Sequence, residues 1–314
     1  MMKLSDVSAI LLKMDNIEIL THHYPDGDTL GSAYALCLGL QSLGKSARVI
    51  LAGKPADKFN YLLNGVKQQD FKADNIVSVD VAANSMLGEN EDKYIGRINL
   101  CIDHHISNSV TADERYVDGE AAAAAEIIFA LLKEMKVNFT KEIADCLYTG
   151  ISTDTGCFMY TNTTPETHKI AAELMEIGCD FEQINKAMFE TKSRAKLRLE
   201  RMVYDTLEFF CNGKCAVIYT TLEMQSKLGL GDDETEGLAS IPRQIEGVLI
   251  GITMREKQGG TFKISVRTNG ETDACEFCKR FGGGGHRAAS GCAVDGSLDE
   301  VRSRLVAAAE EVLK

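Results

Sequence analysis

The sequence predicts an α/β protein with two domains: an N-terminal domain with a doubly wound, mostly parallel sheet, and a smaller α/β domain after it. Three observations lead to this expectation. Short apolar runs typical of buried strands alternate with helical stretches over the first half of the chain. A charged helical run then ends the alternation, and closely spaced strands follow it. The length of 314 residues is sufficient for two separate cores.

Four apolar runs in the N-terminal half have the length and composition of buried strands. The predicted strands are 17–20, 47–51, 76–81 and 98–102. Between and after these predicted strands, apolar residues recur with helical spacing at 29–43, 121–135 and 142–151, where we expect helices. Because parallel neighbours need long crossover connections, this alternation favours a parallel sheet with helices on its faces.

A helical run from about residue 165 to residue 204 carries several basic residues and suits a connection between domains. After it, strands at 207–210 and 216–219 flank Asn212-Gly213, a dipeptide typical of hairpin turns. Further strands are expected at 248–254 and 262–266, and an amphipathic helix at 298–313. The predicted domains are therefore 1–190 and 206–314, joined by a helical linker at 191–205.

Composition excludes several classes of protein. A net charge of -12 argues against a broad electrostatic grip on duplex DNA, so a nucleic-acid ligand should be short and held locally. No apolar run approaches the ~18 residues of a membrane span, and the N-terminus lacks the pattern of a secretory signal. The ten cysteines are scattered through apolar segments, as buried thiols are in a reducing compartment. We therefore expect a cytoplasmic protein without membrane contact.

Acidic and histidine side chains form four short clusters, each where a predicted strand or helix gives way to a turn. Their members are His22, Asp26, Asp28, Asp80, Asp103, His104, His105 and Asp154. In open α/β sheets, ligands bind beyond the carboxyl ends of the strands. Four of the aspartates, gathered at one edge, would raise one another's pKa sharply unless cations intervened. The clusters therefore predict a site for two divalent metal ions.

The types of ligand narrow the metal and the reaction. Carboxylate oxygens with imidazole and no thiolate suit Mn²⁺ best, with Co²⁺, Fe²⁺ or Mg²⁺ left open. Two such ions about 3.5–4 Å apart can activate a water and clamp both oxygens of a phosphoryl displacement, which indicates phosphoester hydrolysis. A helix expected to begin near Ser32 adds backbone amides that favour anions.

These motifs resemble those of the DHH phosphoesterase family. The similar residues are His22-x-x-Pro25-Asp26-Gly27-Asp28, Asp80, Asp103-His104-His105 and Asp154, and the stretch 282–291 is similar to the signature of the DHHA1 C-terminal domain. The resemblance covers nearly the whole chain and implies a DHH domain followed by a DHHA1 domain. Within the family, the chain resembles NrnA-type bifunctional enzymes, which trim short oligoribonucleotides (nanoRNA) and dephosphorylate 3′,5′-bisphosphoadenosine (pAp).

The resemblance also implies a role for each motif residue. One Mn²⁺ would be held by His22, Asp26 and Asp80, and the other by Asp28, Asp80, His104 and Asp154, so that Asp80 bridges them. His105 would face the scissile phosphate as a charge stabiliser or proton donor, and Asp103 would orient a neighbouring imidazole. Substrate phosphate would be held by Arg267, Gly283, Gly284, Gly285, His286 and Arg287. A homodimer is implied by the resemblance alone.

The glycine-rich signature has a physical rationale of its own. Consecutive glycines let backbone amides approach a phosphate, and Lys279, Arg280 and Arg287 lie nearby with no carboxylate between residues 277 and 290. A cleft reaching from the metals to this loop would span a few nucleotides and favour short RNA. The alanine run 121–125 replaces hydroxyl residues that are usual in related sequences, which suggests that a hydroxyl contact near the cleft is lost.

Other functions stay open at this point. The same metals could serve hydrolysis of cyclic di-AMP or of its linear product pApA, and a catalytically silent nucleotide-binding regulator is an alternative of another class. Inorganic pyrophosphatase is disfavoured, because resembling enzymes have a different C-terminal signature. The Walker A letters at 39–46 end a predicted helix instead of opening one. Cys275-x-x-Cys278, in a predicted helix, favours buried thiols over a zinc site.

Overall fold

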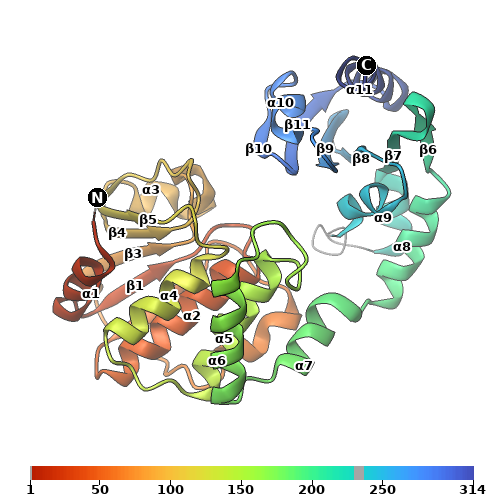
Figure 1. Ribbon diagram of the computed structural model, residues 1–314. Helices are drawn as coiled ribbons and strands as arrows, with labels where there is room; N and C mark the ends of the chain where they lie inside the picture. The colour runs from red at the N-terminus through yellow and green to blue at the C-terminus, as the bar shows by residue number, and fades with distance from the viewer. Residues whose placement is uncertain (1, 230–236) are drawn as a thin grey trace. The chain divides into compact units, whose positions relative to one another are not determined.

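The computed structural model describes residues 2–229 and 237–314, which form two compact units with their boundary between Thr191 and Lys192 (Figure 1). The first unit contains five strands, all parallel, in the order β2-β1-β3-β4-β5. They are β1 (Ile17–Leu20), β2 (Ala47–Ile50), β3 (Asn75–Val79), β4 (Ile98–Asp103) and β5 (Ala112–Val117). The second unit contains a mixed sheet. The predicted α/β class is confirmed.

Helices cover both faces of the first sheet, as expected of a doubly wound fold (Figure 1). They are α1 (Leu4–Lys13), α2 (Gly27–Ser42), α3 (Glu91–Tyr94), α4 (Ala124–Glu134), α5 (Lys141–Asp154), α6 (Pro165–Ile177) and α7 (Phe181–Asn185), with short 3₁₀ segments at Asp57–Leu63 and Asn84–Asn90. One face packs against α2, α4 and α5 around Ile17 and Ile19, and the other contacts α3 around Leu20. Because both faces of the sheet are covered at β1, all four of its residues are buried.

The strand order places a winding reversal beside β1. β2 pairs with one edge of β1, and β3, β4 and β5 follow on the other side. In sheets of this kind a ligand crevice lies at the carboxyl ends of the strands next to the reversal, here β1 and β3. His22 and Asp80 lie directly after these two strands.

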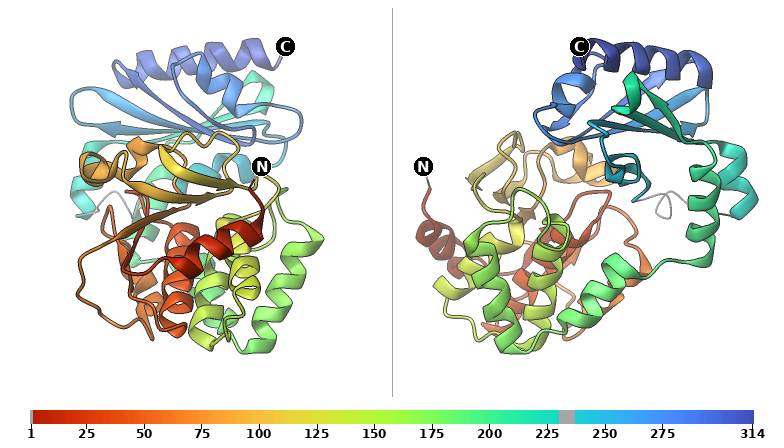
Figure 2. Two further views of the ribbon diagram at one scale, coloured as in Figure 1. Left: turned by 90° about the vertical axis from the view of Figure 1, so that its left-hand side faces the viewer. Right: turned by 45° about the vertical axis from the view of Figure 1, so that its right-hand side comes forward.

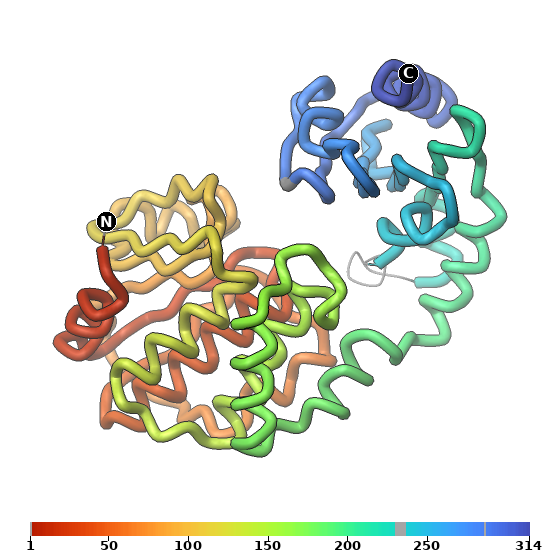
Figure 3. The backbone as a smooth tube through the Cα atoms, in the orientation of Figure 1, coloured from red at the N-terminus to blue at the C-terminus, as the bar shows by residue number. Residues whose placement is uncertain are grey.

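The sequence expectations differ from the structure at β5 and in the run 165–204. β5 was not predicted, because it is an edge strand whose middle residues, Asp113, Glu114 and Arg115, are charged and exposed. The helical run 165–204 is not continuous: α6 ends at Gly178 in the left-handed conformation, and α7, a π-helical turn (Lys186–Glu190) and α8 (Arg194–Tyr204) follow as separate segments (Figure 3).

The second unit has the strand order β10-β11-β9-β8-β7-β6. The strands are β6 (Glu208–Phe210), β7 (Cys215–Thr220), β8 (Ile250–Lys257), β9 (Thr261–Thr268), β10 (Gly284–His286) and β11 (Ala289–Asp295). β7 and β8 are parallel, and the other described neighbours are antiparallel, including the predicted hairpin at Asn212-Gly213. The helices are α8, α9 (Leu222–Leu228), α10 (Ala274–Lys279) and α11 (Leu298–Val312).

The two faces of the second sheet are covered differently. α10 and α11 pack on one face, and Figure 2 shows α11, in dark blue, lying across it. A smaller apolar cluster from α8 and two short 3₁₀ turns, Leu238–Ser240 and Pro242–Gln244, covers part of the other face. Across the described part of both units, no helix combines the length and apolar character needed to cross a bilayer.

Candidate metal centre and phosphate-binding residues

The loop after β1 brings His22 and Asp26 to the start of α2. The helix begins at Gly27 and not near Ser32 as expected, because Asp26 caps it: one carboxylate oxygen accepts hydrogen bonds from two backbone amides of the first turn, at 3.0 and 3.1 Å. The other oxygen of Asp26 lies 3.7 Å from Nε2 of His22. The cap therefore fixes a carboxylate next to an imidazole nitrogen.

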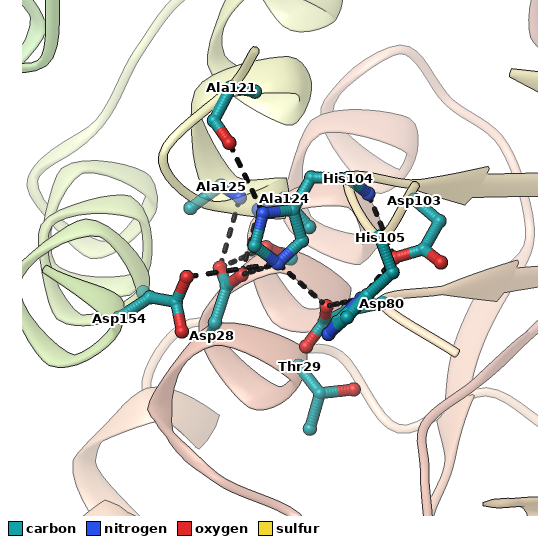
Figure 4. Close-up of polar contacts among 12 residues, drawn as sticks. Asp28, Thr29, Asp80, Asp103, His104, His105, Ala121, Ala124, Ala125 and Asp154 are labelled. Atoms are coloured by element: carbon teal, nitrogen blue, oxygen red, sulfur yellow. Dashed lines mark hydrogen bonds and ion pairs between the residues drawn. The ribbon is translucent and has the colours of Figure 1, made fainter. Parts of the chain in front are cut away.

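Asp28 is buried in the first turn of α2 and is held by the backbone of α4. Its two carboxylate oxygens accept hydrogen bonds from the amides of Ala124 at 2.7 Å and Ala125 at 3.0 Å (Figure 4), and one also accepts from the Ser32 hydroxyl at 3.1 Å. The N-terminus of a helix favours a carboxylate in this position. The alanine run 121–125 thus supports the site through backbone groups, a role the sequence did not reveal.

Asp80 follows β3 and lies between two histidines. Its φ of 58° is left-handed, which is uncommon for a residue other than glycine. Its Oδ2 lies 3.8 Å from Nε2 of His22, and its Oδ1 lies 3.5 Å from Nε2 of His104. Among the described residues, Oδ1 has no hydrogen-bond partner although it is buried. A buried carboxylate oxygen left without a donor is suited to a cation.

His104 presents one ring nitrogen to three carboxylates. Its Nδ1 donates a hydrogen bond to the Ala121 carbonyl at 3.2 Å, so Nε2 faces Asp28 at 3.8 Å, Asp80 at 3.5 Å and Asp154 at 3.7 Å (Figure 4). A metal-binding histidine usually donates its other ring nitrogen to a carbonyl or carboxylate in this way. The contact with the Ala121 carbonyl therefore directs Nε2 of His104 at the three carboxylates, as in a metal-binding histidine.

Asp103, the last residue of β4, is fully buried and positions His105. Its Oδ1 accepts a hydrogen bond from Nδ1 of His105 at 2.8 Å, and its Oδ2 accepts one from the Asn108 amide at 2.6 Å. Burial alone would raise the pKa of Asp103, but the hydrogen bond and charge of His105, with the Asn108 bond, hold it below its usual value. Asn108 was not predicted, since no motif singled it out.

The carboxylates crowd one another. Loss of hydration raises the pKa of Asp80 well above its usual range and that of Asp154 to about 8, and the nearby Asp26 and Asp28 add to both shifts. Burial also raises the pKa of Asp28. Without a cation, some of these groups hold protons at neutral pH. Oxygen and imidazole donors without thiolate, together with the unpartnered Asp80 oxygen, fit divalent metal ions.

Three overlapping sets of donors lie close enough together to hold an ion. They are His22, Asp26 and Asp80; Asp28, His104 and Asp154; and Asp80, Asp103, His104 and His105. Within each set, the ligand atoms lie within 4.8 Å of one another. The first set contains the three residues expected to hold one ion. The second set contains three of the four expected to hold the other, and the fourth, Asp80, lies 3.5 Å from His104.

The residues expected to hold substrate phosphate lie in the second unit. Gly284, Gly285 and His286 form β10, and Arg287 follows them; the side chain of His286 lies outside the described part of the structure. Arg267 lies on β9, in register with Ala289 of β11. The hairpin of β10 and β11 therefore brings the glycine-rich signature next to the strand that carries Arg267.

Two of the signature glycines use their amides within the unit. The amides of Gly282 and Gly283 donate hydrogen bonds to the carbonyls of Lys279 at 3.1 Å and Cys278 at 3.0 Å, so a phosphate near Gly283 would be held through other groups. A Cβ at Gly283 would lie 2.2 Å from a carbonyl oxygen of β11, which explains the need for glycine there. At Gly284 a Cβ would meet nothing within 4 Å.

The nearby basic side chains are paired with carboxylates from outside the signature. Lys279 contacts Glu276 at 2.6 Å and Arg280 contacts Glu311 at 2.9 Å. The exposed Arg287 contacts Glu271 at 3.1 Å. The absence of acidic residues within 277–290 therefore overstated the local positive charge, although exposed pairs of this kind are weak and readily exchanged.

Comparisons with known proteins agree over both units. Residues 16–151 match the model of the DHH family, N-terminal domain, and residues 213–314 match that of the DHHA1 domain. The bifunctional oligoribonuclease and PAP phosphatase NrnA of Thermus thermophilus is 30% identical over 307 residues, which cover 95% of this chain and 90% of the relative. The chain belongs to the DHH/DHHA1 family. It is a DHH-type phosphoesterase, homologous to NrnA, with a metal-binding cluster of histidine and aspartate.

Solved structures show how widely this DHH/DHHA1 fold is shared. The crystal structure of an exopolyphosphatase-related protein from Bacteroides fragilis superposes with a TM-score of 0.89 at 27% identity, covering 99% of this chain and 97% of that one. RecJ from Thermus thermophilus, in complex with Mn²⁺, gives 0.59 at 17% identity and covers 99% of this chain but 54% of that one. The second likeness concerns the fold alone.

Proposed function

We propose that this DHH/DHHA1 protein is a Mn²⁺-dependent phosphoesterase that hydrolyses short oligoribonucleotides to mononucleotides and removes the 3′-phosphate of pAp. The observation that carries the proposal is the position of Asp80, whose two oxygens lie 3.8 and 3.5 Å from the Nε2 atoms of His22 and His104. The substrate class is supported by the relative named as a bifunctional oligoribonuclease and PAP phosphatase. Mn²⁺ is supported by the mixed carboxylate and imidazole donors.

Six side chains would hold two ions. They are His22, Asp26, Asp28, Asp80, His104 and Asp154. Bound divalent ions supply Lewis-acid polarisation of a phosphoryl oxygen and lower the pKa of water. The chain keeps the ligands in place by backbone contacts: the α4 amides hold Asp28, and the Ala121 carbonyl holds His104. Such supporting contacts restrict the ligands to one orientation.

His105 is the proposed proton donor to the departing oxygen. Its Nδ1 donates a hydrogen bond to Asp103, so the proton for the departing oxygen would come from Nε2. The buried, ionised Asp103 stabilises the protonated imidazole, as a positioning carboxylate does in acid–base pairs. Asp103 is therefore a positioning residue and His105 a catalytic one.

Substrate phosphate would be held in the second unit by Arg267, Gly283, Gly284, Gly285, His286 and Arg287. Gly284 leaves open space beside the backbone, which lets a ligand approach it closely. Arg287 is exposed and could exchange its contact with Glu271 for a phosphate oxygen. The homodimer and the cytoplasmic location stay predictions from the sequence.

A parallel turnover assay with Mn²⁺ tests the proposal. The substrates are a 5′-labelled RNA dinucleotide, pAp, pApA, cyclic di-AMP and pyrophosphate. Fast release from the dinucleotide and pAp is the expected result. A preference for cyclic di-AMP or pApA would replace the substrate assignment, and a preference for pyrophosphate would reject it. No turnover of any of the five would favour the nucleotide-binding regulator.

A further inference from the structure

The second sheet has one face that its apolar core does not explain. Along β8 and β9, alternate residues such as Ile252 and Ile264 enter the core beneath α10 and α11. The residues between them lie on the opposite face, where Thr253 is in register with Ser265, and Arg255 with Lys263. Like charges directly opposite each other on neighbouring strands are unfavourable. This face therefore brings hydroxyl and cationic side chains together, and both cations also take part in other polar interactions.

A pocket of about 360 Å³ opens on this face. Three hydroxyl residues and three cationic residues contribute to its lining: Thr220, Thr253, Ser265, Arg255, Lys263 and Arg267. None of the described residues that line it carries a carboxylate. All the described residues that line the pocket belong to the second unit.

Two buried hydroxyl groups point to a missing ligand. Thr220 is 0% exposed and Thr253 is 6% exposed, and within the described chain the Oγ1 of each has no hydrogen-bond partner. Other buried threonines of this unit are satisfied: Thr206 donates to the Val203 carbonyl at 2.7 Å, and Thr268 donates to the Arg287 carbonyl at 3.2 Å. An unpaired buried hydroxyl destabilises a protein, so two of them at one pocket need a reason.

We propose that this pocket binds a phosphodiester group of a short RNA strand, at a position other than the scissile one. Arg255 and Lys263 take part in other polar interactions as well, so the inference rests on the hydroxyls, the opposed charges and the pocket together. Hydroxyl and cationic donors are the groups that recognise phosphate oxygens. The inference rests on the proposed function, since it extends the substrate site from Arg267 to Arg255, Lys263 and the two threonines.

Binding without turnover tests the pocket directly. The full chain is titrated in EDTA with a fluorescently labelled RNA tetranucleotide, and anisotropy is followed at several salt concentrations. Lys263→Met and Arg255→Met should each weaken binding about tenfold and reduce the slope of log K against log salt by ~0.7, the value for one lost phosphate contact to a single strand. Lys263→Arg should restore binding. Arg304→Met, on the exposed side of α11, is the matched control and should change neither quantity.

Thr253→Val separates a ligand site from a structural defect. The substitution removes an unpaired buried hydroxyl, so the free protein should melt at the same or a higher temperature while its Kd for the tetranucleotide rises several-fold. A higher melting temperature with an unchanged Kd would overturn the inference. So would unchanged Kd and salt slope in both Lys263→Met and Arg255→Met.

The arms of the experiment separate this inference from the proposed function. Turnover of RNA by the wild type with unchanged binding in the pocket variants would reject the pocket alone. If the wild type does not turn over RNA but binds it in a way that depends on Lys263, the proposed function is rejected and the inference about the pocket is kept. Two results together would assign the pocket to free phosphate and overturn the RNA assignment. Millimolar inorganic phosphate would displace the tetranucleotide from the wild type, and Lys263→Met would weaken binding of a dinucleotide and of the tetranucleotide equally.

Discussion

Asp80 combines a left-handed backbone with a crowded electrostatic position. Aspartate adopts the left-handed conformation more readily than most residues, so the larger cost is the burial of this carboxylate among others. A buried carboxylate that destabilises the fold is one whose position serves another purpose. Its oxygens face His22 on one side and His104 on the other, which is why we propose Asp80 as the shared ligand.

Asp80→Asn should therefore abolish hydrolysis, with at least a thousandfold loss of kcat/KM, while the fold is kept. Asparagine has the same size, tolerates the left-handed conformation and removes one of the repelling charges. Bound Mn²⁺, measured by elemental analysis after gel filtration, should fall with the activity. Asp92→Asn, an exposed aspartate of α3, is the control. Activity of Asp80→Asn near the wild-type level would refute the shared-ligand assignment.

Asp103→Asn should lower kcat by about 10²–10⁴ and leave Mn²⁺ content and KM close to those of the wild type. The reason is that an amide no longer stabilises the protonated His105, although it keeps the hydrogen-bond distance. A variant that loses metal in proportion to its activity would place Asp103 among the ligands instead.

At the residue level, sequence motifs could indicate the side chains but not what holds them. The eight acidic and histidine residues singled out in the sequence do lie together, because each is at or next to an end of a strand or helix at one edge of the sheet. Asn108 and the amides of Ala124 and Ala125 could not be found in this way. Backbone donors carry no signature in the sequence, and an asparagine in a turn has many other uses.

Helix packing beneath the site depends on close approach between α2 and α5. A Cβ at Gly31 of α2 would lie 2.3 Å from the Cys146 carbonyl of α5, and a Cβ at Gly150 would lie 2.8 Å from the Asp28 carboxylate. Two glycines thus let the helices meet at backbone distance. The sequence showed Gly31 as part of a motif, but the reason for it appears only when α5 is packed against it.

Gly31→Ala should destabilise the protein by about 1–3 kcal/mol, since the extra methyl group has to displace backbone atoms. Urea denaturation with an unchanged m-value would measure it. Gly44→Ala is a useful comparison: it has a φ of 82° with nothing within 4 Å of a Cβ, so it should lose only the ~1–2 kcal/mol of left-handed strain. Equal losses at the two positions would show that packing adds nothing at Gly31.

Elements were predictable where the sequence has a clear apolar run. β1, β2, β3 and β4 were all expected from their apolar runs, whereas β5 is polar and its pairing with β4 is visible only in the folded sheet. The helix α6 ends because Gly178 adopts the left-handed conformation. The residues on both sides of Gly178 have helical spacing and many charges, so periodicity alone predicts one continuous helix. Edge position and helix ends are therefore the features that periodicity describes least well.

On the scale of the whole molecule, the metal centre should couple stability to pH. Asp80 and Asp154 have folded-state pKa values above those of an unfolded chain, and that of Asp154 is about 8. The folded protein then binds more protons than the unfolded one, so stability is lost as pH rises from about 4 to about 8. In EDTA, the melting temperature should fall over this range. An increase instead would contradict the shared burial of these carboxylates.

Mn²⁺ should reverse that trend. Divalent ions take the place of the protons, so the gain in melting temperature on adding Mn²⁺ should be larger at pH 8 than at pH 6, and binding at pH 7 should release protons into a weak buffer. The net charge of -12 makes nonspecific cation binding the main competitor, and Ca²⁺ at the same concentration controls for it. A gain in melting temperature that does not depend on pH would show that the metal does not bind through these carboxylates.

The support given to Asp28 and His104 by the α4 turn has an evolutionary consequence. Because the amides of Ala124 and Ala125 and the carbonyl of Ala121 make those contacts, the chemistry at the site is insensitive to which small side chains occupy 121–125. Packing is the remaining constraint, because residues 122–125 are buried. Proline at 124 or 125 is the substitution that this segment cannot tolerate, since proline has no amide hydrogen to give.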